Sequence, residues 1–167
     1  RICDENCCTE FRLAADEAER ESLWKGRKGA FGAFGAISPA YYCLDGTVPR
    51  SKLAEVLAEF DRIGDKFGLR ITNVFHAGDG SLHPNVLFDE RVPNETERAV
   101  ECGAEVLKAC IRAGGVLSGE HGIGIEKINE MREQFDEPTL AMMGRLQRVI
   151  DPRGRMNPGK VLPGGDI

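Results

Sequence analysis

The sequence predicts an α+β fold of the ferredoxin-like type, an antiparallel sheet with helices on one face. Its 167 residues are long enough for a real core, with ordinary hydrophobic (41%) and charged (29%) contents. Two segments, near residues 51–67 and 94–113, place apolar residues at helical spacing. Runs rich in β-forming residues flank them, which gives the βαββαβ order of a ferredoxin-like sandwich over residues 39–118.

Residues 1–38 lead into this core. Thr9–Leu13 reads as a short strand, and an Ala- and Glu-rich helix is expected from about residue 15 to 28. The glycines of residues 29–38 predict an irregular loop open to substrate.

In the first half of the core, residues 41–48 read as a strand. Ser51 is expected to cap a helix that Gly68 ends. Residues 69–75 and 82–88 follow as two strands, joined by a Gly-Asp-Gly turn.

The second half begins with Asn94 and Glu97, whose spacing predicts a capping box. That helix should end at Gly114-Gly115, before a last short strand at residues 116–118. Two helices and an extended tail then complete residues 119–167, at residues 126–135, 139–150 and 154–163.

Bulk properties exclude several classes of function. The net charge is −5 with scattered Lys and Arg, so no nucleic-acid surface is predicted. No apolar run approaches the roughly 20 residues of a membrane span. Six cysteines without secretory features indicate reduced thiols and a cytoplasmic location, and Cys3, Cys7 and Cys8 fit no common zinc spacing. The opening without Met suggests one domain, 1–167, cut from a longer protein.

All three histidines lie in two glycine-rich stretches, residues 76–85 and 118–124. If Asp79-Gly80 is a two-residue hairpin turn, His76 faces His83 across the strands with Cβ atoms about 4.5–5.5 Å apart. Asn85 would share that face. Pro84 has no N–H to donate, so its strand is expected at an edge or irregular.

These residues suit a metal ion and a base. Two histidines and a carboxylate can hold zinc or manganese with positions open for a substrate oxygen. Glu120 and His121 are adjacent, so one can join the metal while the other faces a substrate. His121 is then free to take a proton, because an imidazole titrates near neutral pH.

Several motifs together resemble one family. HAGDGSLHPN, GGVLSGEHGIGIEK and DPRGRMNPGKVLP, with LWKGRK and SPAYYCLDGTVPR, are similar to the C-terminal domain of FAD-linked 2-hydroxy-acid oxidases and dehydrogenases, in the vanillyl-alcohol oxidase superfamily. The resemblance implies a cap over a flavin bound mainly by an N-terminal FAD-binding domain that this chain lacks. It assigns a divalent metal to His76, His83 and Glu120, the base to His121, substrate binding to Arg27 and Asn85, and contacts toward the flavin to Asn157 and Lys160.

The chain departs from the pattern at two positions. Ser81 stands where asparagine is usual. Cys43 lies near the position of a substrate-binding lysine in hydroxyglutarate enzymes, which favours a small monocarboxylate such as glycolate or lactate. Arg27 also has a simpler interpretation, since a cation in the last turn of a helix interacts favourably with the helix dipole.

The implied reaction is oxidation of a 2-hydroxy acid to a 2-oxo acid by hydride transfer to FAD, with the isolated chain inactive. The implied partners are the FAD-binding domain, the small substrate and an iron–sulfur electron-transfer subunit, with peripheral attachment to the inner membrane as an alternative location. Two other functions stay open: a metal-dependent hydrolase using His76, His83 and Glu120, and a non-catalytic ferredoxin-like module that dimerises or senses a ligand.

Overall fold

A computed structural model describes residues 1–164 and divides the chain into two compact units, Arg1–Ala36 and a second unit that begins at Ile37. The boundary lies close to the predicted one at residue 38. That the two units work as one domain stays a prediction.

The first unit is helical. It contains α1 (Ile2–Glu5), α2 (Glu17–Lys28) and α3 (Ala30–Phe34). The Asp16 carboxylate caps α2 by accepting a hydrogen bond from the Glu19 backbone N–H. The predicted helix is therefore confirmed to within two residues.

Two predictions for this unit are wrong. Residues 9–13 form no strand, because no other strand among residues 1–164 hydrogen-bonds to them. The expected loop at 29–38 contains α3, whose Phe31 and Phe34 rings meet edge to face. One turn brings residues three apart onto one side, so this aromatic pair suits a helix despite the glycines.

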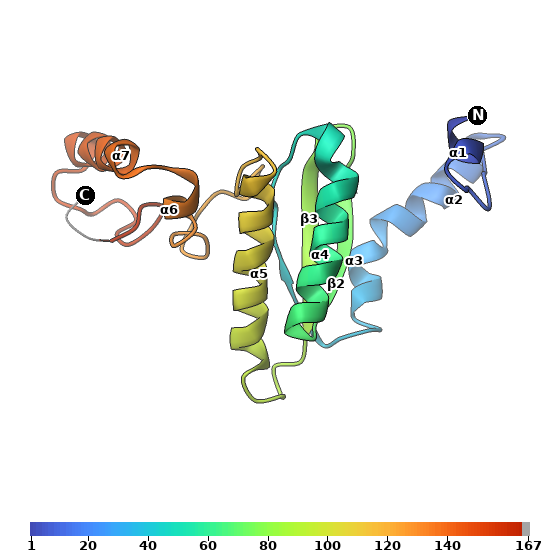
Figure 1. Cartoon of the computed structure of the whole chain (residues 1–167), viewed down its shortest axis with the longest axis horizontal. Helices are drawn as coiled ribbons and strands as arrows, with labels where there is room; N and C mark the ends of the chain where they lie inside the picture. The colour runs from blue at the N-terminus through green and yellow to red at the C-terminus, as the bar shows by residue number, and fades with distance from the viewer. Residues whose placement is uncertain (165–167) are drawn as a thin grey trace. The chain divides into compact units, whose positions relative to one another are not determined.

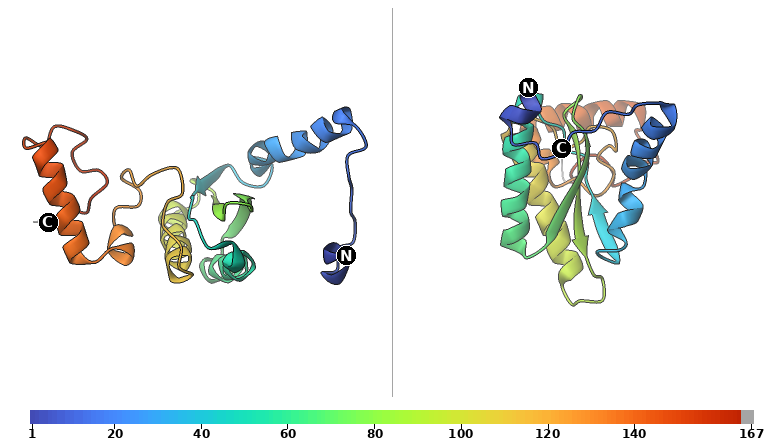
Figure 2. Two further views of the ribbon diagram at one scale, coloured as in Figure 1. Left: turned by 90° about the horizontal axis from the view of Figure 1, so that it is seen from above. Right: turned by 90° about the vertical axis from the view of Figure 1, so that its right-hand side faces the viewer.

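The second unit is built on a three-stranded antiparallel sheet. Its strands are β1 (Ala40–Cys43), β2 (Arg70–His76) and β3 (Ser81–Phe88), in the order β1-β3-β2. Helices α4 (Leu53–Phe67) and α5 (Glu95–Arg112) lie side by side over one face of the sheet (Figures 1 and 2). The α+β class and the placing of both helices on one face are confirmed.

The predicted fourth strand is reduced to a single bridge. Thr47 and Val116 exchange both backbone hydrogen bonds, at 2.9 and 2.8 Å, without a longer ladder. Because Thr47 continues the β1 segment, Val116 lies beside β1, where the last strand of a ferredoxin-like sheet belongs. The order of elements is kept, with its last strand one residue long.

Alternation along the strands separates two faces of the sheet. The helix-covered face carries the apolar core, whose fully buried members share the spaces between the strands and α4 and α5: Leu44, Phe60, Leu82, Val86, Val106 and Leu107. The other face carries most of the polar side chains discussed below. A second, smaller core lies toward the C-terminus and contains Leu117, Met131 and Leu140.

The hairpin between β2 and β3 has a different register from the predicted one. His76 pairs with Ser81 and Val74 pairs with His83. The turn holds four residues, 77–80, since the amides of Asp79 and Gly80 both donate to the His76 carbonyl at 3.0 Å. A shift of two positions preserves the side-chain faces, so His76 and His83 still share one face.

Pro84 lies in the central strand, so the expected edge position is wrong, whereas the alternative expectation of an irregularity is met on its β1 side. Its carbonyl accepts a hydrogen bond from the Leu44 N–H at 3.0 Å, but it has no N–H to return. The β1 ladder stops there and resumes in the same register, where Leu82 donates to the Gly46 carbonyl and Val48 donates to the Gly80 carbonyl, both at 2.9 Å. The expected strand at 41–48 is thus one interrupted strand.

Helix ends meet expectation in part. Gly68 ends α4 with φ of +63°, as predicted. Ser51 does not cap α4, because it lies within a 3-10 turn, η1 (Arg50–Lys52). Asn94 makes no capping hydrogen bond, and its backbone is left-handed (φ +63°) rather than in the extended conformation that capping residues usually adopt.

The C-terminal part holds two helices, α6 (Met131–Gln134) and α7 (Glu137–Ile150). The helix predicted at 126–135 is shortened to α6. Asp136 caps α7 by accepting from the Thr139 N–H at 3.0 Å. Among the helices of residues 1–164, none combines the length and the hydrophobicity of a membrane span.

Candidate functional site

The candidate site lies on the sheet face opposite α4 and α5. His76 ends β2, His83 lies on β3, and Asp45 follows β1. The hydrogen bonds of Leu44 and Gly46 to the β3 segment place Asp45 opposite His83. Glu120 and His121 reach this face from the loop after Val116, which is joined to the same segment. Segments far apart in the sequence therefore meet at one end of the sheet.

Three of these side chains form a cluster that could hold a metal ion. One ligand atom from each of His76, His83 and Glu120 lies within 4.8 Å of the other two. His83 Nε2 is 2.8 Å from Glu120 Oε1, and the imidazoles of His76 and His83 meet edge to face at 5.4 Å. His83 is buried, whereas His76 and Glu120 are exposed, so the cluster opens to solvent. Two nitrogens and a carboxylate are a donor set that zinc or manganese accepts.

His121 lies against the same cluster without joining it. Its ring stacks on His83 with centroids 5.3 Å apart and planes 20° from parallel. Its Nδ1 is 3.8 Å from Asp45 Oδ1, which leaves Nε2 as the ring nitrogen free for another partner. The structure thus brings the four predicted residues together and places the His121 imidazole outside the cluster of His76, His83 and Glu120.

Asn85 lies two residues along β3 from His83 on the same face, as predicted. It is completely buried, and its Nδ2 donates to the His83 carbonyl at 2.7 Å. Its Oδ1 has no protein partner. The hydroxyls of Thr47 and Ser81 are also buried without a partner.

An open depression of about 400 Å³ adjoins the cluster. It is lined by Thr47, His76, Asp79, Ser81, Gly119 and Glu120. Two hydroxyls, two carboxylates and an imidazole are suitable groups for binding a small polar ligand or its hydration water.

Asp45 and Lys127 are functional candidates that the sequence did not single out. Both are almost completely buried, and the Lys127 ammonium donates to Asp45 Oδ1. Burial raises the pKa of the Asp45 carboxyl, but hydrogen bonds from Lys127 and from the backbone amides of His121 and Glu120 together bring this pKa below its ordinary value. A carboxylate within an otherwise apolar strand was the available signal, and both residues lie inside the quoted motifs.

Two predicted cofactor residues lie in the C-terminal tail. Lys160 lines a hollow of about 330 Å³ together with His121 and residues 122–127. Its Nζ is 3.4 Å from Asn157 Oδ1, and the Val161 N–H donates to the Gly124 carbonyl at 2.8 Å. The tail is therefore held beside the loop that carries His121.

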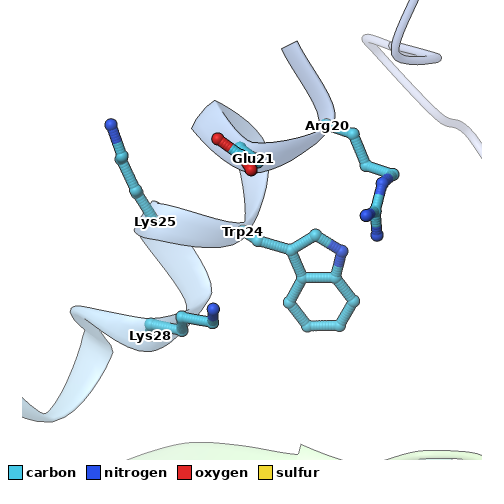
Figure 3. A pocket seen from close by; sticks show the side chains of 5 residues that line it. All are labelled: Arg20, Glu21, Trp24, Lys25 and Lys28. Carbon is cyan, nitrogen blue, oxygen red and sulfur yellow. The ribbon is translucent and has the colours of Figure 1, made fainter. Parts of the chain in front are cut away.

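Arg27 belongs to the first unit, in the last turn of α2, and is not placed relative to the histidines. The same helix borders a hollow of about 490 Å³, lined by Arg20, Glu21, Trp24, Lys25 and Lys28 (Figure 3). Trp24 is half exposed there, and Arg27 is not among the lining residues.

Comparison with known proteins assigns the chain. Residues 1–161 match the family described as FAD linked oxidases, C-terminal domain. The chain belongs to this family. The resemblance inferred from the motifs is confirmed, and relatives named as glycolate oxidase subunits are among the matches. The family's description names neither a hydrolase nor a binding module.

Individual relatives cover nearly the whole chain. The glycolate oxidase subunit GlcD of Escherichia coli K12 is 51% identical over 93% of this chain and 31% of its own length. The protein of that name from Bacillus subtilis is 33% identical over 96% of the chain and 34% of its own length. The mitochondrial D-lactate dehydrogenase [cytochrome] of Arabidopsis thaliana is 30% identical over 98% of the chain and 29% of its own length. This member of the FAD-linked oxidase family thus spans about a third of the length of these relatives.

Proposed function

We propose that this chain is the substrate-side part of an FAD-dependent enzyme that oxidises a small 2-hydroxy acid, of the glycolate or D-lactate type, to a 2-oxo acid. The observation that carries the proposal is the separation of His121 from the His76–His83–Glu120 cluster, within a chain of the FAD-linked oxidase family. In the whole protein, an N-terminal domain would bind most of the FAD. When bound, FAD supplies the hydride acceptor.

The cluster is proposed to hold a divalent ion, zinc or manganese. Its fit rests on the donor set and on the short distances between the three ligand atoms. Such an ion would polarise the hydroxyl and carboxylate oxygens of the substrate. Asn85 adds a buried amide oxygen without a partner, two residues from His83, which suits a substrate contact.

The Nε2 atom of His121 is proposed to accept the proton of the substrate hydroxyl. Its Nδ1 faces Asp45, and its ring is held against His83, so Nε2 is the nitrogen left for the substrate. A correctly placed base accelerates such a reaction about 10²- to 10⁴-fold. Arg27 is proposed to bind the substrate carboxylate with its planar guanidinium. Asn157 and Lys160, beside the His121 loop, are proposed to contact the flavin.

The charges of the site favour a monocarboxylate. Cys43, which points to the same sheet face as Asp45, carries no positive charge. Lys127 is the cation nearest in the sequence to the His121 loop, but Asp45 occupies it. A second, distal carboxylate would therefore find no positive charge at Cys43 and only an ammonium already paired with Asp45 at Lys127.

The setting in the cell is proposed from other features. All six cysteines are free in the structure, which suits a reducing, cytoplasmic compartment. Because relatives are named as subunits of a glycolate oxidase, we propose an iron–sulfur subunit as electron acceptor and peripheral attachment at the inner membrane as its place.

The decisive experiment uses the full-length flavoprotein and follows anaerobic bleaching of the flavin by glycolate, D-lactate and D-2-hydroxyglutarate. Glycolate or D-lactate should reduce the flavin fastest. His121→Ala should slow reduction at least 100-fold while leaving zinc binding intact, whereas His76→Ala should weaken zinc binding. Normal flavin reduction by His121→Ala would refute the base. Hydrolytic turnover by the zinc-loaded 167-residue chain would support the hydrolase instead.

A further inference from the structure

We propose that Asp45 is a positioning residue that fixes the backbone carrying Glu120 and His121, with Lys127 as its fixed counter-charge. The inference rests on the roles proposed above for Glu120 and His121. It concerns how the chain holds them, which the family assignment does not address.

Asp45 is placed by the interrupted β1 strand. Its side chain points to the same face as His83, and none of it reaches solvent. A carboxylate at such a position is costly unless hydrogen bonds and an opposite charge compensate for lost hydration. The partners of Asp45 therefore show what the residue is for.

Apart from Lys127, the partners of the Asp45 carboxylate form one continuous segment of chain, residues 118–121. Asp45 Oδ2 accepts hydrogen bonds from the Ser118 hydroxyl at 3.0 Å and from three consecutive backbone amides: Gly119 at 3.1 Å, Glu120 at 2.8 Å and His121 at 2.5 Å. Successive N–H groups converging on one anion form a nest, a geometry that fixes the backbone dihedrals of all three residues. The Asp45 carbonyl also accepts from the Gly119 N–H at 2.8 Å.

The two carboxylate oxygens have different tasks. Oδ2 accepts from all three loop amides, whereas Oδ1 accepts from Lys127 and lies 3.8 Å from His121 Nδ1; the Ser118 hydroxyl is within 3.2 Å of both oxygens. An ion pair with a purely structural role would need only the contact between Oδ1 and Lys127. The loop contacts therefore call for a further explanation.

That explanation is the placing of two side chains around one ring. Glu120 reaches His83 Nε2 at 2.8 Å, and His121 stacks on the face of the same imidazole. The backbone N–H groups of these same two residues donate hydrogen bonds to Asp45. A rotation of this backbone would move the proposed ligand and the proposed base together.

Gly119 shows how closely the anchored loop approaches the sheet. A Cβ atom there would lie 2.4 Å from Thr47 Oγ1 and 3.0 Å from Ser81 Oγ. The loop thus has almost no freedom to shift toward the sheet. Asp45 restrains it from moving away.

The test uses the 167-residue chain and two probes, amide hydrogen exchange by NMR and zinc titration. Asp45→Asn should accelerate exchange at Gly119, Glu120 and His121 by about 10- to 100-fold, because hydrogen bonds to a charged acceptor are the ones lost. Zinc affinity should fall about 10- to 100-fold, as for other residues that orient metal ligands. The ring-current shift that His83 imposes on His121 should shrink.

A matched control and a milder variant keep the test decisive. Asp61→Asn removes an exposed carboxylate on α4 and should change none of these readouts. If Asp45→Asn does not fold, Ser118→Ala removes the hydroxyl that donates to Asp45 and accepts from the Gly122 N–H, and should give the same pattern with changes below about tenfold.

Three results would overturn the inference: unchanged exchange at the three amides, equal acceleration of core amides such as Val86, or unchanged zinc affinity together with an unchanged His121 ring-current shift. Failure of the native chain to bind zinc would instead refute the metal proposal. The exchange and ring-current readouts would still decide the role of Asp45.

Discussion

Replacing Lys127 by Met tests the energetics of the buried charge pair. The substitution removes a cation of which only 2% is exposed and leaves an apolar side chain of similar length. Asp45 then remains buried as an anion, with its hydrogen bonds from Ser118 and three backbone amides but no opposite charge.

Breaking a buried ion pair by removing one partner costs about 3–5 kcal/mol. The remaining hydrogen bonds to Asp45 Oδ2 partly stabilise the anion, so we expect the lower end, about 3 kcal/mol of unfolding free energy. Asp45→Asn should also destabilise, since it leaves Lys127 unpaired. The double variant should lose less unfolding free energy than the two single variants lose together, by at least about 1 kcal/mol.

Urea unfolding followed by far-UV circular dichroism gives all four free energies of the cycle. As a control, Lys52→Met removes the exposed Lys52–Glu55 pair and should cost less than about 1 kcal/mol. Losses for Asp45 and Lys127 that add within about 0.5 kcal/mol would show that the two side chains do not stabilise each other, and would refute the reasoning.

Three further outcomes are expected. Gly68→Ala, at φ of +63°, should lose about 1 kcal/mol of unfolding free energy in urea, whereas Gly78→Ala, with an ordinary φ and open space around it, should lose little. Burial raises the pKa of the Cys110 thiol to about 12 and that of Cys102 to about 11, so the unfolded chain loses these protons at a lower pH than the folded chain does. The free energy of unfolding should therefore fall as the pH rises above about 8.5. If the urea midpoint of Cys110→Ala declines with pH as steeply as that of the native chain, the Cys110 thiol is not the cause. Leu146→Lys on the exposed side of α7 should change the free energy by less than about 0.5 kcal/mol, and a larger loss would mean that this side is covered.

Patterns with a clear physical period were predictable from sequence. The apolar spacing of α4 and α5 gave both helices, and the alternation of β3 gave a polar and an apolar face. His76 and His83 were assigned to one face even though the register was wrong by two. Side-chain direction depends only on whether the shift is even or odd.

What could not be predicted depends on partners distant in sequence. Nothing near Asp45 in the sequence indicates that its carboxylate would bind amides more than 70 residues later. The length of the turn after His76 was likewise hidden, because Asp79-Gly80 fits a two-residue turn on composition alone. The one-residue contact at Val116 depends on Thr47, whose strand Pro84 had interrupted.

The separation in sequence of these contacts has a consequence for folding. His76 and His83 belong to a local hairpin, whereas Glu120 and His121 are held beside them through contacts with Asp45 that span more than 70 residues. Closing so long a loop must be compensated by contacts already formed. We therefore expect the complete cluster to form among the last steps of folding. A metal ion that needs all three ligands would then bind the finished fold and stabilise it selectively.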